Sequence, residues 1–151
     1  MKENASLPLP VRLLGLSGVL PQVICLGAVL VEAGSPGANV PAAMGLAYAA
    51  LILSFLGGLW WMAALQQGVT RAGPYVLAVL PSLLGWVALF PLALGLDAVH
   101  SALGFVGALL LLSPLVDLYL ERSIPLPPGW VRLRMMMAGG LGLLTLALAL
   151  V

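Results

Sequence analysis

The chain has 151 residues, of which 62% are hydrophobic and only 7% are charged, whereas soluble globular domains carry roughly 25% charged residues. Polar side chains are too few to cover a water-exposed exterior, so the composition excludes a soluble domain. A formal net charge of +1, with no run of basic residues, gives no basic stripe for a nucleic-acid backbone, and we expect no nucleic-acid partner.

Five apolar runs, each long enough to cross a bilayer, follow one another along the chain. A helix needs about 20 apolar residues to cross roughly 30 Å of hydrocarbon. The runs are bounded by charged residues, glycine or proline and cover residues 11–32, 42–67, 75–95, 97–122 and 130–151. They are continuous and about twice as long as a β-barrel strand. We therefore predict an all-α integral membrane bundle of five helices, forming a single transmembrane domain over residues 1–151.

Prolines and a weak repeat add detail to this bundle. Prolines within the runs predict kinks in the first, third and fourth helices, at Pro21, Pro81, Pro91 and Pro114. The segment GVLPQ in the first helix resembles AVLPS in the third, and a shift of 59 residues aligns small residues of the second and fourth helices. This pattern suggests a duplicated helical hairpin followed by one extra helix.

The basic residues predict the orientation of the chain. Five crossings place every basic residue on one side, namely Lys2, Arg12, Arg71, Arg122, Arg132 and Arg134. Lysine and arginine are enriched on the cytoplasmic side of membrane proteins. We therefore expect a multi-pass protein of a bacterial inner membrane, with a cytoplasmic N-terminus and a periplasmic C-terminus.

Asp117 is the most informative single residue of the sequence. It lies near the inner end of the fourth predicted helix, where an unpaired carboxylate is costly to bury. Arg132 and Arg134 follow at the start of the fifth helix. We predict a structural ion pair between Asp117 and these arginines that fixes how the two helices meet. A proton-relay or ligand role, and simple exposure to headgroups, are the alternatives.

A second polar group lies at the inner end of the second helix and comprises Gln66, Gln67 and Arg71. The group is typical of an ordinary membrane interface, and a contact with a lipid or quinone headgroup is the alternative function. One cysteine and one histidine cannot supply the ligands of a metal cluster. We predict no metal and no cofactor other than a bound lipid or quinone.

Glycines recur in the predicted helices, where they let backbones approach closely without a hydrophobic driving force. We expect helix packing at Gly57, Gly58, Gly104, Gly107, Gly139 and Gly140.

Three segments carry a resemblance to a known family: YAALILSFLGGLWW (48–61), VLPSLLGWVAL (79–89), and Asp117 followed by LPPGWVRLR (126–134). Together they resemble the family of domain of unknown function 3429, over nearly the whole chain. The resemblance implies a small multi-span membrane protein with relatives in bacteria and mitochondria, and it brings no established activity. Members often carry histidine at the position of Trp60, so a role of that histidine does not transfer to this chain.

No nucleotide-binding, nucleophile-elbow or paired-carboxylate motif occurs in the sequence. We expect a non-catalytic accessory subunit or assembly factor of a larger respiratory or photosynthetic membrane complex, with lipids and other membrane subunits as partners. A small transporter or channel is the first alternative, and it predicts a polar path through Tyr48, Ser54, Gln66 and Asp117. A membrane enzyme, or a lipid- or quinone-binding protein centred on the inner arginines, is the second.

Overall fold

The computed structural model describes residues 7–32, 39–122 and 126–151, and these residues form helices and turns without a strand. The all-α prediction is therefore confirmed. The helices are α1 (Leu9–Ser17), α2 (Leu20–Val31), α3 (Asn39–Gln66), α4 (Gly73–Ala88), α5 (Phe90–Leu94), α6 (Val99–Glu121) and α7 (Trp130–Leu148).

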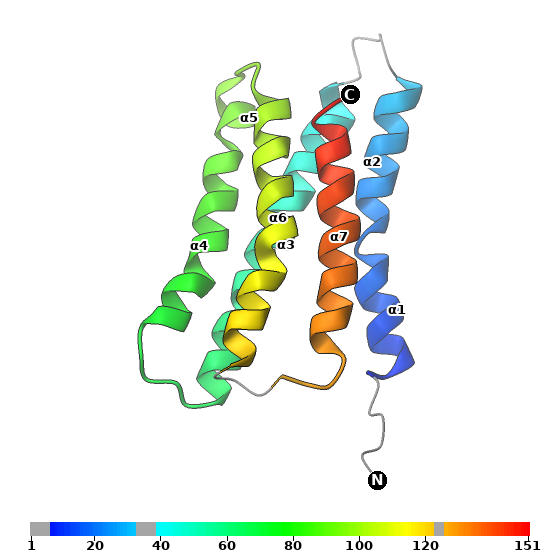
Figure 1. Cartoon of the computed structure of the whole chain (residues 1–151). Helices are drawn as coiled ribbons and strands as arrows, with labels where there is room; N and C mark the ends of the chain where they lie inside the picture. The colour runs from blue at the N-terminus through cyan, green and yellow to red at the C-terminus, as the bar shows by residue number, and fades with distance from the viewer. Residues whose placement is uncertain (1–6, 33–38, 123–125) are drawn as a thin grey trace.

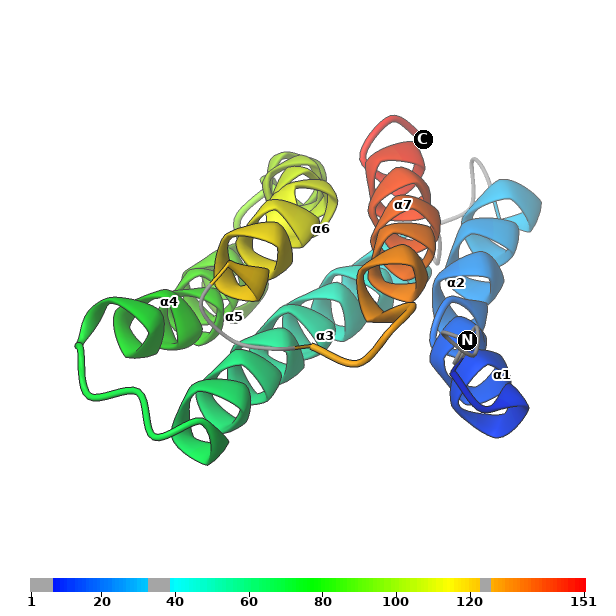
Figure 2. The same cartoon turned by 60° about the horizontal axis from the view of Figure 1, so that its bottom comes forward.

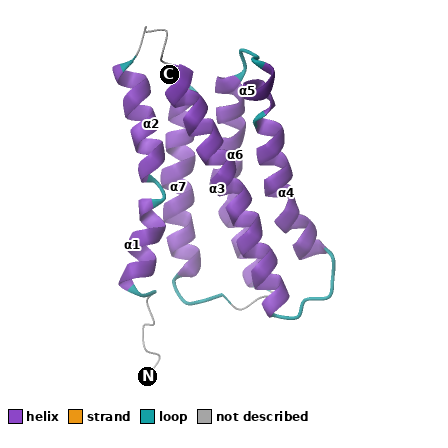
Figure 3. Cartoon of the chain, turned by 180° about the vertical axis from the view of Figure 1, so that it is seen from behind, coloured by secondary structure: helices purple, strands orange, loops and turns teal. Residues whose placement is uncertain are grey.

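Five stretches of the described chain are long and apolar enough to cross a membrane: Leu9–Val31, Asn39–Gln66, Gly73–Leu94, Val99–Glu121 and Trp130–Leu150. The first stretch combines α1 with α2, and the third combines α4 with α5. The five stretches run alternately up and down, so the two ends of the chain lie at opposite ends of the bundle (Figure 1 and Figure 3).

α3 is the central helix of the bundle. It packs against α2, α4, α6 and α7, and the tilted view in Figure 2 shows α4 and α6 on one side of it and α7 and α2 on the other. Its buried leucines, such as Leu46 and Leu56, share one hydrophobic core with Leu103 and Leu110 of α6. The α1–α2 stretch is the least buried of the five.

Two prolines coincide with breaks between helices, as predicted. Pro21 stands in the first turn of α2, just after α1 has ended, and Pro91 stands in the first turn of α5. At the first break, the amide of Gln22 donates to the carbonyl of Val19, and Pro21 has no amide hydrogen. The carbonyl of Gly18 is therefore released from the helical pattern, and it accepts a hydrogen bond from the Tyr48 hydroxyl instead.

The other two prolines lie inside continuous helices. Pro81 is internal to α4 and Pro114 is internal to α6. Neighbouring helices can satisfy backbone groups that a proline frees in a membrane span. The aligned prolines of the suggested repeat thus differ, since Pro21 follows a break and Pro81 does not; the repeat itself stays a prediction.

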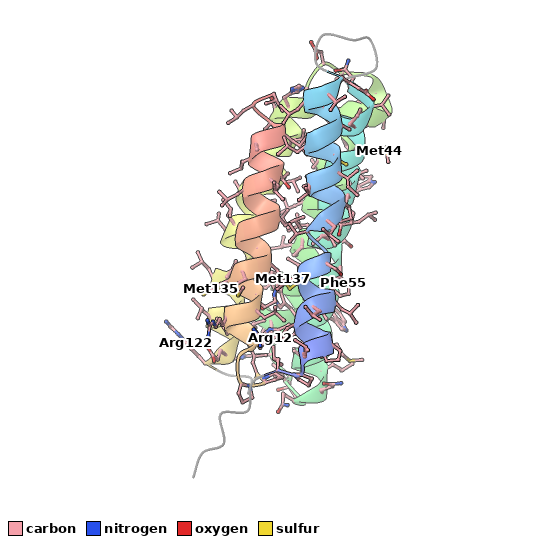
Figure 4. The ribbon with its side chains drawn as sticks, turned by 90° about the vertical axis from the view of Figure 1, so that its right-hand side faces the viewer. Arg12, Met44, Phe55, Arg122, Met135 and Met137 are labelled. Atoms are coloured by element: carbon pink, nitrogen blue, oxygen red, sulfur yellow. The ribbon has the colours of Figure 1, made fainter. Side chains whose placement is uncertain are left out.

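Charged side chains lie at the ends of the described bundle, with Asp117 and Arg134 as the buried exceptions. Arg12 and Arg122 are both at the lower end in Figure 4, the end where α1 and α7 begin and α6 finishes. Glu32, Asp97 and His100 belong to the opposite end. Lys2 lies outside the described residues.

Candidate functional site

A buried polar cluster joins three helices near the end of the bundle where α7 begins. Asp117 and Ser113 come from α6, and their spacing of four residues puts both side chains on one face of that helix. Arg134 comes from the second turn of α7, and Trp60 comes from the last two turns of α3. The exposed fractions of Asp117, Arg134 and Trp60 are only 1%, 3% and 5%.

Both carboxylate oxygens of Asp117 accept hydrogen bonds. Arg134 Nε donates to Oδ2 at 3.0 Å, which makes a salt bridge, and Trp60 Nε1 donates to Oδ1 at 2.8 Å. A single buried charge is expensive in the low dielectric of a membrane interior, and a paired and hydrogen-bonded one is much less so. The partners of Asp117 therefore offset the cost of burying its carboxylate.

Ser113 completes the cluster, and its hydroxyl has hydrogen-bond partners on both sides. Its hydroxyl donates to the carbonyl of Leu110 at 2.8 Å, and Arg134 Nη2 approaches its oxygen at 3.5 Å, a distance at which a hydrogen bond is weak. A serine nucleophile needs a neighbouring general base to take its proton, and this hydroxyl proton points at a backbone carbonyl. The cluster is thus built to hold α3, α6 and α7 together.

The predicted partnership of Arg132 with Asp117 is wrong, because the two arginines point to different places. Arg134 is buried against Asp117, whereas Arg132 is exposed and lines a separate pocket with Arg12 of α1. Residues two apart on a helix are separated by about 200° around its axis, so both arginines cannot face α6.

A pocket of about 220 Å³ opens beside the cluster. Asp117 and Trp60 contribute to its wall, Gln66 and Trp130 also line it, and most of its remaining lining is apolar. Gln67 directly follows the last residue of α3, Arg71 lies in the loop after it, and both side chains are exposed. Of the predicted interface group, Gln66 is thus the residue that the structure brings to the same pocket as Asp117.

The polar groups that a transport path would need point to different helices. Tyr48 donates to the Gly18 carbonyl at the α1–α2 break, whereas Ser54 pairs with Ser82 of α4 at 2.9 Å. Gln66 and Asp117 lie farther along, at the pocket just described. Tyr48 and Ser54 therefore serve as separate contacts between helices.

The predicted packing glycines fall into three groups. A Cβ atom on Gly57 would lie 2.1 Å from the Ala78 carbonyl oxygen, and one on Gly107 would lie 2.9 Å from Cγ of Leu146. Contacts at Gly140 and Gly104 are looser, at 3.4 Å from Val19 and 3.9 Å from Ala149. At Gly58 and Gly139 a Cβ would meet no described atom within 4 Å, so neither glycine allows a close contact within the described chain.

Several contacts have no counterpart among the sequence-based predictions. Gln22 Nε2 donates to the Thr145 hydroxyl at 2.9 Å, and that hydroxyl donates to the Leu141 carbonyl at 2.7 Å, which ties α2 to α7. Gln22 is fully buried. The signal in the sequence is a lone amide side chain inside an apolar span, where polar groups need partners. The hydrogen bond from Trp60 to Asp117 likewise has no counterpart among those predictions.

These features define the class of the molecule: a multi-pass α-helical membrane protein with a buried ion pair near one end of its bundle. The chain belongs to the family described as protein of unknown function (DUF3429), whose sequence profile matches residues 7–151. The resemblance seen in the sequence is thereby confirmed over nearly the whole chain. No curated protein and no solved structure matches the chain.

Proposed function

We propose that this protein is a non-catalytic membrane subunit that packs against other membrane proteins, as an accessory or assembly factor of a bioenergetic complex in a bacterial inner membrane. The fully engaged Asp117 cluster supports the non-catalytic part of this proposal. Both carboxylate oxygens are occupied by Trp60 and Arg134, and the Ser113 proton is donated to a carbonyl. In this arrangement the polar side chains stabilise the bundle.

One feature of α3 carries the proposal of a protein partner. Large apolar side chains with exposed fractions of at least 50% follow its outer side at spacings of three, four or seven residues, with Gly58 among them. We call this set the outer stripe of α3: Met44, Leu51, Phe55, Gly58 and Met62. Met44 and Phe55 are labelled on the same side of the molecule in Figure 4.

The open space at Gly58 is what distinguishes the outer stripe from an ordinary lipid-facing surface. Small residues on transmembrane helices let a second helix approach closely, which is a main source of association in lipid. Gly58 has no described neighbour within 4 Å of its Cβ position, so its smallness serves no contact within the described part of the chain. A helix of a partner subunit fits this position.

The orientation in this proposal has the N-terminus in the cytoplasm. The exposed arginines Arg12, Arg71, Arg122 and Arg132 belong to the end of the bundle where the chain starts. The excess of arginine on cytoplasmic segments supports this orientation. The C-terminus then lies in the periplasm.

Photo-crosslinking in native membranes tests the proposal. A benzophenone amino acid at position 55 probes the outer stripe, and the same amino acid at position 105 is the control, because Phe55 and Phe105 are both exposed phenylalanines, at 57% and 44%. We expect a discrete protein adduct from position 55, identified by mass spectrometry, and only lipid adducts from position 105.

A variant strengthens this test. Gly58→Leu should abolish the adduct at position 55 without lowering the thermal stability of the purified protein, since nothing in the described chain occupies that space. The absence of a protein adduct at position 55, together with purification as a solitary chain in mild detergent, would refute the proposal.

A further inference from the structure

Two arginines from opposite ends of the sequence meet at one pocket. Arg12 in the first turn of α1 and Arg132 in the first turn of α7 both line a pocket of about 170 Å³. Arg12 is labelled in Figure 4 at the end of the molecule where α1 and α7 begin, and these two helices are in contact. The packing of the first helix against the last therefore creates a doubly basic pocket.

Neither arginine has a carboxylate partner among the described residues. The salt bridge found among the described residues joins Asp117 to Arg134, whereas Arg12 and Arg132 are exposed. Among the described residues, no acidic side chain lines the pocket. Two neighbouring guanidinium groups repel each other, so their placement at one pocket favours a bound anion that lies between them.

The rest of the pocket is apolar. Leu16 of α1 and Leu133 and Met136 of α7 form its walls together with the two arginines, and Gly129 lies at the start of α7. The pocket also opens at the N-terminal end of α7, where the helix dipole adds to the attraction for an anion. An occupant that matches these walls has an anionic group at the bundle end and apolar atoms directed along the helices.

We propose that this pocket, the Arg12–Arg132 pocket, binds the phosphate of an anionic phospholipid. The guanidinium groups bind the phosphate oxygens, and the apolar walls contact the beginning of the acyl chains. Basic pockets between transmembrane helices near the membrane surface bind such headgroups in other proteins. The proposal does not depend on the proposed function, because it concerns α1 and α7 rather than the outer stripe of α3.

The test uses the full chain in lipid nanodiscs that contain phosphatidylglycerol and phosphatidylcholine, followed by native mass spectrometry. Arg12→Gln and Arg132→Gln each remove one guanidinium group, and Arg122→Gln is the matched control, because Arg122 is an exposed arginine at the same end that does not line this pocket. We expect wild type and Arg122→Gln to retain phosphatidylglycerol.

Retention should fall about fivefold for each pocket arginine removed, the change that corresponds to about 1 kcal/mol per basic side chain at a membrane surface. Helical circular dichroism should be unchanged in all three variants because the substituted side chains are exposed. Equal retention by all variants, or equal retention of phosphatidylcholine and phosphatidylglycerol by wild type, would overturn the proposal.

A second arm identifies the source of the phosphate. Inorganic phosphate is added to the protein in a zwitterionic detergent, and the thermal unfolding midpoint is compared with that after addition of short-chain phosphatidylglycerol. The phospholipid should raise the midpoint in wild type and in Arg122→Gln but less in Arg12→Gln. Stabilisation by inorganic phosphate equal to that by the lipid would overturn the assignment to a phospholipid and indicate a site for free phosphate.

Discussion

Arg134 Nε lies 3.0 Å from Asp117 Oδ2 in a position where both side chains are almost completely buried. The pair joins α7 to α6, and Trp60 extends the connection to α3 through its bond to the other carboxylate oxygen. One carboxylate thus connects three of the five spans. Each oxygen of the Asp117 carboxylate has a different partner, so each interaction can be removed by its own substitution.

Replacing Asp117 by asparagine should destabilise the bundle strongly. The variant keeps the size of the side chain and leaves the Arg134 charge buried without its counter-charge, which costs about 3–5 kcal/mol for a broken buried pair. Thermal unfolding in detergent measures the loss. Glu121→Gln, an exposed carboxyl one turn further along α6, is the control and should change stability by less than about 0.5 kcal/mol.

The double variant Asp117→Asn with Arg134→Gln separates the ion pair from general disruption. Removing both charges eliminates the unpaired one, so the double variant should lose less stability than the sum of the two single variants. A coupling near zero in this double-mutant cycle would show that the two charges do not stabilise each other.

Trp60→Phe should lower the stability of the bundle because it removes one hydrogen bond to Asp117. Phenylalanine keeps an aromatic ring in the buried site but cannot donate to Asp117 Oδ1, and a hydrogen bond to a charged group contributes about 1.5–3 kcal/mol. Trp61→Phe is the matched control, since Trp61 is 44% exposed and makes an edge contact with Tyr75 that a phenylalanine ring can keep. Equal losses in the two variants would contradict the assigned role of Trp60.

Neighbouring glycines in α3 should respond in opposite ways to alanine. At Gly57 the new Cβ would lie 2.1 Å from the Ala78 carbonyl oxygen, so α4 must move, and overpacking of this kind costs about 1–3 kcal/mol or more. At Gly58 the Cβ meets open space, and the higher helix propensity of alanine should raise stability by up to about 1 kcal/mol. Thermal unfolding of the two purified variants checks both signs.

The sequence predicts the helices of this protein better than their contacts. Apolar runs bounded by polar, glycine and proline residues predict the five spans closely, because bilayer thickness sets the length of a crossing helix. Breaks appear at Pro21 and Pro91 but not at Pro81 and Pro114. A proline alone cannot predict this difference, since it depends on what the neighbouring helices supply to the freed carbonyl.

The buried cluster shows the same limit at the level of side chains. Proximity in the chain is enough to connect Asp117 with the arginines that follow it, and it cannot distinguish Arg134 from Arg132 until the rotation of α7 is known. Trp60 is 57 residues from Asp117, and their contact follows from how α3 packs against α6. The meeting of Arg12 with Arg132 likewise depends on the first helix packing against the last.

Gln22 and Thr145 give a prediction in which removing polar groups helps. The Gln22 amide donates to Thr145, but its Oε1 is buried without a hydrogen-bond partner in the described chain. Thr145→Val alone should destabilise the protein by about 1–3 kcal/mol, because the Gln22 amide then loses its acceptor. The double variant Gln22→Leu with Thr145→Val removes both unpaired groups and keeps similar side-chain volumes, so its unfolding midpoint should return to that of wild type or exceed it. A double variant less stable than Thr145→Val would show that the amide makes a further interaction that stabilises the contact between α2 and α7.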